Sequence, residues 1–168
     1  ELYDTLSHQL AFLQRIVDAN QSQIEYVKPH GALYNDLVNN EEKAIHFIRT
    51  IRQINPNLKI MGLANSPFKI LVEHAGLEFI SEAFADRKYA GKLKLKSRSE
   101  NDALLKSEDQ VIDQLKTFLD HELIDEQGIL HKLHMDSICF HSDTPNALNL
   151  LKVAYEFLKS NQITIASD

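Results

Sequence analysis

Cysteine is scarce in this sequence: Cys139 is the only one among 168 residues. A single thiol cannot form a disulfide within the chain, so a disulfide-stabilised scaffold is excluded and a reducing cytoplasm is expected. Cys139 lies in the apolar run "SICFH". We therefore predict that it is a small buried hydrophobic side chain and not a nucleophile.

Long apolar runs and excess positive charge are absent as well. No stretch approaches the roughly 20 apolar residues of a membrane-spanning helix, and the start "ELYDTLSHQLAFLQRI" has no basic n-region or apolar h-region, so neither a membrane span nor a signal peptide is expected. The net charge of −6 argues against a nucleic-acid partner. Neither a Walker A motif nor G-x-G-x-x-G occurs, which excludes nucleotide sites of those two types.

The composition that is present, 43% hydrophobic and 25% charged, is typical of one globular domain, here expected to span residues 1–168. Apolar periodicity predicts helices over residues 2–20, 41–54, 66–76 and 107–121, and a last helix whose apolar face carries Leu148, Leu151 and Leu158. Short apolar runs predict strands at 24–28, 58–63, 77–83 and 137–141. Residues 84–104 are expected to be irregular, with a solvated β-ribbon at 92–98.

Alternating strands and helices predict an α/β fold with a parallel sheet. A closed β/α barrel needs about 250 residues, so the expected architecture is a partial barrel. Functional loops of such folds follow the C-terminal ends of the strands. Polar residues gather at these positions, so we expect four loops to bring ionisable and amide groups to one rim of the sheet: Lys28, His30, Tyr34, Asn35, Asn65, Ser66, Glu82, Asp86, Arg87, His141, Asp143 and Thr144.

Several of these residues also have a purely structural explanation. His30 follows a proline and would then only cap a strand. Asp86 and Arg87 would form a loop ion pair, worth about 0–1 kcal/mol if exposed. Asp143 would be the N-cap of a helix beginning near Pro145. A further pair, three residues apart, has the spacing of metal ligands, but nothing nearby completes a site and none is predicted; it consists of His131 and His134.

Five stretches, in this order, resemble the LamB/YcsF family: "VKPHGALYN", "MGLANS", "EAFADRKY", "RSENDALL" and "CFHSDTPNAL". The resemblance extends from Leu2 to Ile165. It implies the C-terminal part of a seven-stranded β/α barrel of the glycoside hydrolase/deacetylase type, in a cytoplasmic protein. It also implies ATP-dependent hydrolysis of 5-oxoproline to glutamate together with two partner subunits. ATP would be the co-substrate, with Mg²⁺; whether the barrel holds a metal is left open.

Carried over by motif, the resemblance assigns nine site positions: Lys28, His30, Tyr34, Asn35, Asp86, Arg87, Arg98, His141 and Asp143. Lactam hydrolysis needs cations for carboxylate and phosphate, a role expected of Lys28, Arg87 and Arg98. It also needs a general base that titrates near neutrality, either His30 or His141. Asp86 or Asp143 is expected to orient that histidine or to activate water, and Tyr34 and Asn35 to contact the substrate.

The sequence also departs from the family's pattern. Ser142 and Asp102 each replace a glycine, and the spacer between Gly91 and Arg98 is two residues longer. The family's N-terminal strands and their motifs are missing, so the match is expected to cover only the C-terminal two-thirds of the family's domain. Loss of those strands would leave open sheet edges, and we therefore expect self-association and an isolated chain of doubtful activity.

Two functions of other classes stay open at this point. One is a non-catalytic half-barrel that binds or assembles with another protein of the same complex. The other is a metal-dependent amidohydrolase of the deacetylase type that needs no ATP. A stoichiometric transition metal would favour the amidohydrolase, and restored activity on adding the N-terminal segment would count against the non-catalytic module.

Overall fold

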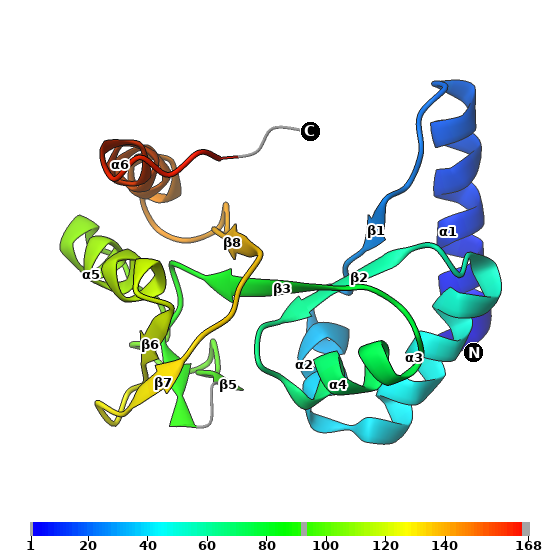
Figure 1. Ribbon diagram of the computed structural model, residues 1–168, viewed down its shortest axis with the longest axis horizontal. Coiled ribbons are helices and arrows are strands. Elements are labelled where there is room, and N and C mark those ends of the chain that lie inside the picture. The colour runs from blue at the N-terminus through cyan, green and yellow to red at the C-terminus, as the bar shows by residue number, and fades with distance from the viewer. Residues whose placement is uncertain (1, 92–93, 166–168) are drawn as a thin grey trace. The chain divides into compact units, whose positions relative to one another are not determined.

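The computed structural model describes residues 2–91 and 94–165. The chain divides into two compact units, Glu1–Glu82 and Ala83–Asp168. Figure 1 shows both units with most of their helices and strands labelled. No helix in the described ranges is long and apolar enough to cross a lipid bilayer. The expectation of one domain over residues 1–168 stays a prediction.

The first unit alternates helices with parallel strands. Its elements are α1 (Leu2–Ala19), β1 (Tyr26–Val27), α2 (Ala32–Asn39), α3 (Glu41–Ile54), β2 (Lys59–Leu63), α4 (Pro67–His74) and β3 (Phe79–Phe84), whose end belongs to the second unit. β1 pairs with β2 in parallel, with Tyr26 opposite Lys59. β2 pairs with β3 in parallel, with Ile60 opposite Phe79. The predicted parallel sheet is confirmed here.

Local sequence explains why α3 begins and which face it buries. The side chain of Asn40 caps the helix by accepting a hydrogen bond from the Lys43 N–H, and two acidic residues in the first turn complement the helix dipole. Its buried face packs into the core of the unit, where the Phe47 and Phe68 rings meet edge to face at 6.1 Å. A helix the sequence analysis did not predict, α2, follows Gly31 (φ 62°), a backbone conformation that glycine adopts without strain.

The second unit contains β4 (Tyr89–Ala90), β5 (Lys94–Leu95), α5 (Glu108–Leu119), β6 (Glu122–Ile124), β7 (Leu130–Lys132), β8 (Ser137–Cys139) and α6 (Ala147–Ser160). β8 is the neighbour of β3 in the strand order β1-β2-β3-β8. Just beyond β3, the Ala85 N–H donates to the Cys139 carbonyl oxygen at 3.1 Å. Two antiparallel hairpins, β4–β5 and β6–β7, complete the unit.

The structure of this unit differs from the sequence-based expectations in four respects. The apolar face assigned to α6 was wrong in part: Leu158 is buried as predicted, but Leu148 and Leu151 are 69% and 48% exposed and Leu150 is buried instead. Leucines lie on more than one side of this helix, so their spacing alone does not select the packed face. The hairpin β6–β7 was not predicted. Of the expected ribbon at 92–98, residues 92–93 lie outside the described residues and β5 covers only two. Cys139 is half-buried and not fully enclosed.

Candidate active site

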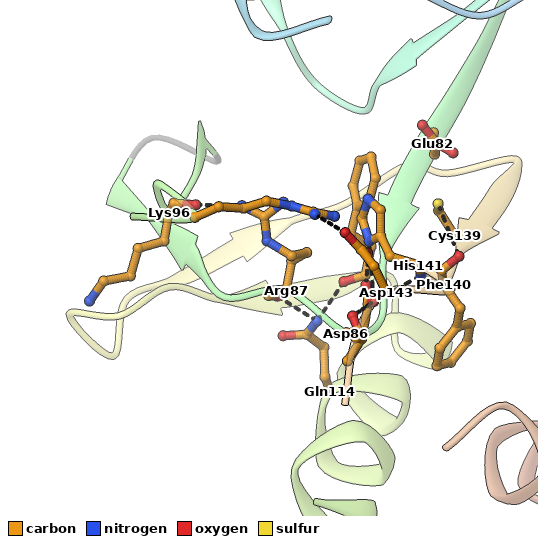
Figure 2. Close-up of polar contacts among 12 residues, drawn as sticks. Glu82, Asp86, Arg87, Lys96, Gln114, Cys139, Phe140, His141 and Asp143 are labelled. Carbon is orange, nitrogen blue, oxygen red and sulfur yellow. Dashed lines mark hydrogen bonds and ion pairs between the residues drawn. The ribbon is translucent and has the colours of Figure 1, made fainter. Parts of the chain in front are cut away.

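Asp86 is the centre of a cluster in the second unit. It lies two residues past β3 and is fully buried. Its Oδ2 accepts hydrogen bonds from the His141 backbone N–H at 2.9 Å and from the Thr144 hydroxyl at 2.6 Å. The His141 ring atom Nδ1 lies 3.0 Å from Oδ1. Figure 2 shows Asp86, in the loop after β3, in contact with His141, in the loop after β8.

These contacts determine the charge of the carboxyl and the tautomer of the ring. Burial favours the neutral form of Asp86, but the hydrogen bonds from the His141 ring and the Thr144 hydroxyl outweigh it, and the pKa of the carboxyl lies below its ordinary value. An ionised carboxylate only accepts, so Nδ1 of His141 must be the donor. Nε2 of a neutral ring then carries the lone pair. The ring also stacks on Phe84, with centroids 5.3 Å apart, so its orientation is held from two sides.

Arg87 presents a buried guanidinium with one unsatisfied donor. The residue is 6% exposed, and its Nη2 donates to the Lys96 carbonyl oxygen at 2.5 Å. Its buried Nε has no hydrogen-bond partner within the described part of the chain. Burial, and then the nearby charge of Arg98, lower the pKa of Arg87. An anion beside the guanidinium would satisfy Nε and offset the burial of the charge. The exposed loop ion pair with Asp86 is not what forms, since both residues are buried.

Arg98 and Asp143 form an ion pair at the surface of the same unit. Nη1 of Arg98 lies 2.6 Å from Oδ2 of Asp143, and the two side chains are 44% and 66% exposed. The hydrogen bond from Arg98 lowers the pKa of the Asp143 carboxyl. Asp143 is not the N-cap of the last helix: α6 begins later, and its N-cap is Asn146 in the left-handed conformation.

A second cluster of predicted residues lies in the first unit, around Glu82. This side chain of β3 is 1% exposed. Its Oε1 forms an ion pair with Nζ of Lys28, and its Oε2 accepts a hydrogen bond from the Tyr34 hydroxyl at 2.9 Å. The sequence analysis placed Glu82 at a strand end but gave it no site role. A signal for it was the carboxylate inside the apolar strand "FISEAF", because buried charges are usually paired.

His30 and Asn35 are exposed. Among the residues that the structure describes, the His30 side chain has no hydrogen-bond partner. Their assignment to the site rests on the sequence and stays a prediction. In the first unit, the structure brings Lys28 and Tyr34 together around Glu82. In the second unit, it pairs Asp86 with His141 and Arg98 with Asp143.

His131 pairs with a carboxylate and not with His134. Its Nε2 lies 2.8 Å from Oδ2 of Asp125, a buried residue whose Oδ1 also accepts the backbone N–H groups of Gln127 and Ile129. These contacts hold the turn between β6 and β7. Within residues 2–91 and 94–165, no group of three or more His, Cys, Asp or Glu side chains is arranged to hold a metal ion.

Comparison with known proteins finds longer relatives that match 99% of this chain. The sequence model of the LamB/YcsF family matches residues 1–167, which corrects the expectation of a match limited to the C-terminal two-thirds of the family's domain. The chain is 38% identical over 168 residues to a protein of Haemophilus influenzae (strain PittEE) that is named as a 5-oxoprolinase subunit, covering 99% of this chain and 69% of the relative. The protein of the same name from Bacillus cereus (strain 03BB102) is 36% identical, with 99% and 67% covered.

A solved structure supports the fold. The crystal structure of a lactam utilization protein from Thermus thermophilus superposes with a TM-score of 0.88 at 24% sequence identity, covering 100% of this chain and 67% of that one. This likeness confirms the predicted α/β fold class of the β/α-barrel type.

Proposed function

This chain belongs to the LamB/YcsF family, and on that premise we propose that it is a cytoplasmic subunit of an ATP-dependent 5-oxoprolinase. The enzyme would open the cyclic amide of 5-oxoproline to give glutamate, and would act with two further subunits. Its relatives are named as subunits of 5-oxoprolinase, which supports this assignment. The observation that carries it is the Asp86–His141 pair, which provides an oriented base at the C-terminal end of a sheet.

The overall reaction consumes one ATP and two waters, one to open the ring and one in net hydrolysis of the nucleotide, and yields glutamate, ADP and inorganic phosphate. A lactam resists attack because amide resonance must be lost, and transfer of the ATP γ-phosphoryl group to the amide oxygen would create a leaving group there. Water adds to the activated carbon, and the C–N bond of the ring breaks to leave an acyl phosphate. The second water hydrolyses this acyl phosphate to the side-chain carboxylate of glutamate and inorganic phosphate. The ring nitrogen takes up protons as it becomes the free amine.

His141 would remove the proton from the attacking water. The ionised Asp86 holds Nδ1 as a donor and so leaves Nε2 able to accept that proton. As the ring becomes an imidazolium, the carboxylate stabilises its positive charge. Asp86 thus acts through His141 as a positioning residue. Thr144 keeps the carboxylate in place through its 2.6 Å hydrogen bond.

Arg87 would bind the substrate carboxylate or the transferred phosphoryl group. Its buried Nε lacks a partner among the described residues, and a guanidinium matches the planar geometry of a carboxylate or phosphate. Arg98, already paired with Asp143 at the surface, is the second cation of this unit. Lys28 and Tyr34, bound to Glu82, form the corresponding polar cluster of the first unit.

Reconstitution tests the proposal. The chain is mixed with two partner subunits of a 5-oxoprolinase, and glutamate and ADP are measured together with the metal content. We expect the two products in equal amounts, and we expect His141→Ala to lower kcat by about 10²–10⁴-fold. His134→Ala is the control, since His134 is exposed and lies outside the cluster.

Three results would overturn the proposal. The first is no ATP-dependent turnover by the assembled wild-type enzyme. The second is turnover that needs a bound transition metal but no ATP, which indicates the deacetylase-type alternative. The third is near-normal turnover by the folded His141→Ala variant.

A further inference from the structure

The side chain of Gln114 bridges the two ends of the segment that carries Asp86. Gln114 lies on α5, and its Nε2 donates to the Phe84 carbonyl oxygen at 2.6 Å and to the Arg87 carbonyl oxygen at 3.0 Å. Figure 2 shows the amide of Gln114 directed from α5 to the backbone beside Asp86 and Arg87. One side chain thus connects two points of the loop from outside it.

Other contacts hold the same segment, and they define what Gln114 adds. The Phe84 N–H donates to the Tyr89 hydroxyl at 2.8 Å. The Asp86 carbonyl oxygen accepts from the Leu105 N–H at 2.9 Å. Each of these contacts ties down one point of the segment. Gln114 instead binds the carbonyl oxygens at both ends of the segment, Phe84 and Arg87, and so restricts the distance between these two residues.

We propose that Gln114 is a positioning residue for Asp86 and Arg87, and this inference rests on the proposed function. It keeps the turn between Phe84 and Arg87 in the shape that places the Asp86 carboxylate against Nδ1 of His141. It does not itself contact the reacting atoms. Because Phe84 also stacks on the His141 ring, the same bridge sets the position of both contacts of that ring.

The chemistry of the bridge selects glutamine. A primary amide nitrogen carries two N–H groups, so one atom can donate to two carbonyl oxygens. Asparagine is one methylene shorter and cannot reach both from the same backbone position. Glutamate has the length but only acceptors when ionised, so its oxygens would repel the two carbonyls. Leucine offers no donor to either carbonyl.

The substitutions are expected to leave a folded protein. Gln114 borders a cavity of about 430 Å³ together with Tyr89, Leu105 and Thr117, so an apolar side chain there is not forced into a filled core. The damage is then confined to the two carbonyl oxygens, which lose one donor each. A shift of the Asp86 carboxylate by even about 1 Å can cost up to about 100-fold in rate.

The test compares Gln114→Leu and Gln114→Asn with Gln110→Leu. Gln110 lies one turn earlier on α5 and accepts from the Lys106 and Ser107 N–H groups as part of the helix cap. Its loss weakens the helix without touching the 84–87 segment, so it is a matched control for stability alone. We measure kcat and KM in the assembled enzyme, the melting temperature, and the titration of the Asp86 carboxyl carbon by NMR in the chain itself.

The expected result is a selective effect. Gln114→Leu should lower kcat by about 10–100-fold with little change in KM, and should raise the titration midpoint of Asp86 because its hydrogen bonds to His141 and Thr144 weaken. Gln114→Asn should give a smaller change of both. Gln110→Leu should lower the melting temperature and leave kcat and the Asp86 titration unchanged.

An unchanged titration midpoint of Asp86 in the folded Gln114→Leu variant overturns the inference. A shift of that midpoint in Gln110→Leu as large as the shift in Gln114→Leu overturns it as well. An unchanged kcat in an active enzyme overturns it as well. The NMR measurement needs neither substrate nor the other proteins of the complex. It therefore decides the role of Gln114 even if the assembled enzyme does not hydrolyse 5-oxoproline, and the two failures remain distinguishable.

Discussion

Nδ1 of His141 lies 3.0 Å from Oδ1 of Asp86, and the backbone N–H of the same histidine donates to Oδ2 of that carboxylate at 2.9 Å. One carboxylate therefore binds both the ring and the main chain of His141. This arrangement restricts rotation of the ring and its tautomer together, because turning the ring away from Asp86 would leave a buried carboxylate oxygen with fewer donors.

Replacing Asp86 with asparagine should impair the reaction far more than the fold. The amide is nearly the same size as the carboxyl, but it carries no negative charge to hold Nδ1 as a donor and to stabilise an imidazolium. We expect kcat of the assembled enzyme to fall by about 10²–10⁴-fold, measured as glutamate formation beside the melting temperature. Asp109→Asn, an exposed change on α5, is the control. Retention of near-normal kcat by Asp86→Asn would show that the pair is only structural.

Removing Lys28 should destabilise the chain more than removing both members of its ion pair. Lys28→Met leaves the Glu82 carboxylate buried without its cation, and breaking a buried pair in this way costs about 3–5 kcal/mol. The double variant Lys28→Met with Glu82→Leu should regain part of the lost free energy of unfolding, because it no longer buries an unpaired carboxylate. Urea unfolding of the two single variants and the double variant measures the coupling.

The control for this cycle is the exposed pair of Lys43 and Asp36, whose side chains are 50% and 45% exposed. Lys43→Met should change the free energy of unfolding by about 0–1 kcal/mol. A similarly small effect of Lys28→Met would mean that Glu82 is accommodated without its lysine, and it would contradict the prediction.

Asp125 should contribute to stability above about pH 4 and lose that contribution in acid. Its hydrogen bond from His131, outweighing burial, lowers the pKa of its carboxyl in the folded state. The unfolded value is about 3.9. A depressed folded pKa stabilises the protein fully above the unfolded value, and the contribution disappears as pH falls through the folded pKa.

Urea midpoints of the wild type and of Asp125→Asn between about pH 2 and 7 test this dependence. The wild type should lose stability towards acid more steeply than the variant, and the two curves should approach each other at the lowest pH. Asp109→Asn should follow the wild type. Parallel curves for the wild type and Asp125→Asn over the whole range would contradict the assignment.

Local features of the sequence were enough to predict most elements and the placement of Asp86 and His141. α3 is encoded by its apolar spacing and its Asn40 cap, and β2 and β3 by short apolar runs between turn residues. Since the carboxyl ends of parallel strands meet at one edge, "FADR" and "CFHSD" were expected at the same edge before their contacts were known. The structure places Asp86 and His141 in contact, as that shared edge implies.

Contacts between distant residues were not predictable in the same way. Gln114 reaches carbonyl oxygens 27 and 30 residues earlier in the chain, and a glutamine on an amphipathic helix has no local signature for such a role. Glu82 binds Lys28, 54 residues away, which depends on the register of the parallel strands. The β6–β7 hairpin has strands of only three residues each, too short for alternation to be recognised.

By itself, the sequence determined which segments form most of the helices and strands, that β1, β2 and β3 run parallel, and which loops carry ionisable groups. These properties follow from spacing, capping and turn residues within a few positions. Only the tertiary structure decided which carboxylate holds which base or cation, which face of α6 is buried, and that Arg98 binds Asp143. Those choices depend on distances between side chains far apart in the chain. Short-range preferences do not encode such distances, whereas packing and burial select among them.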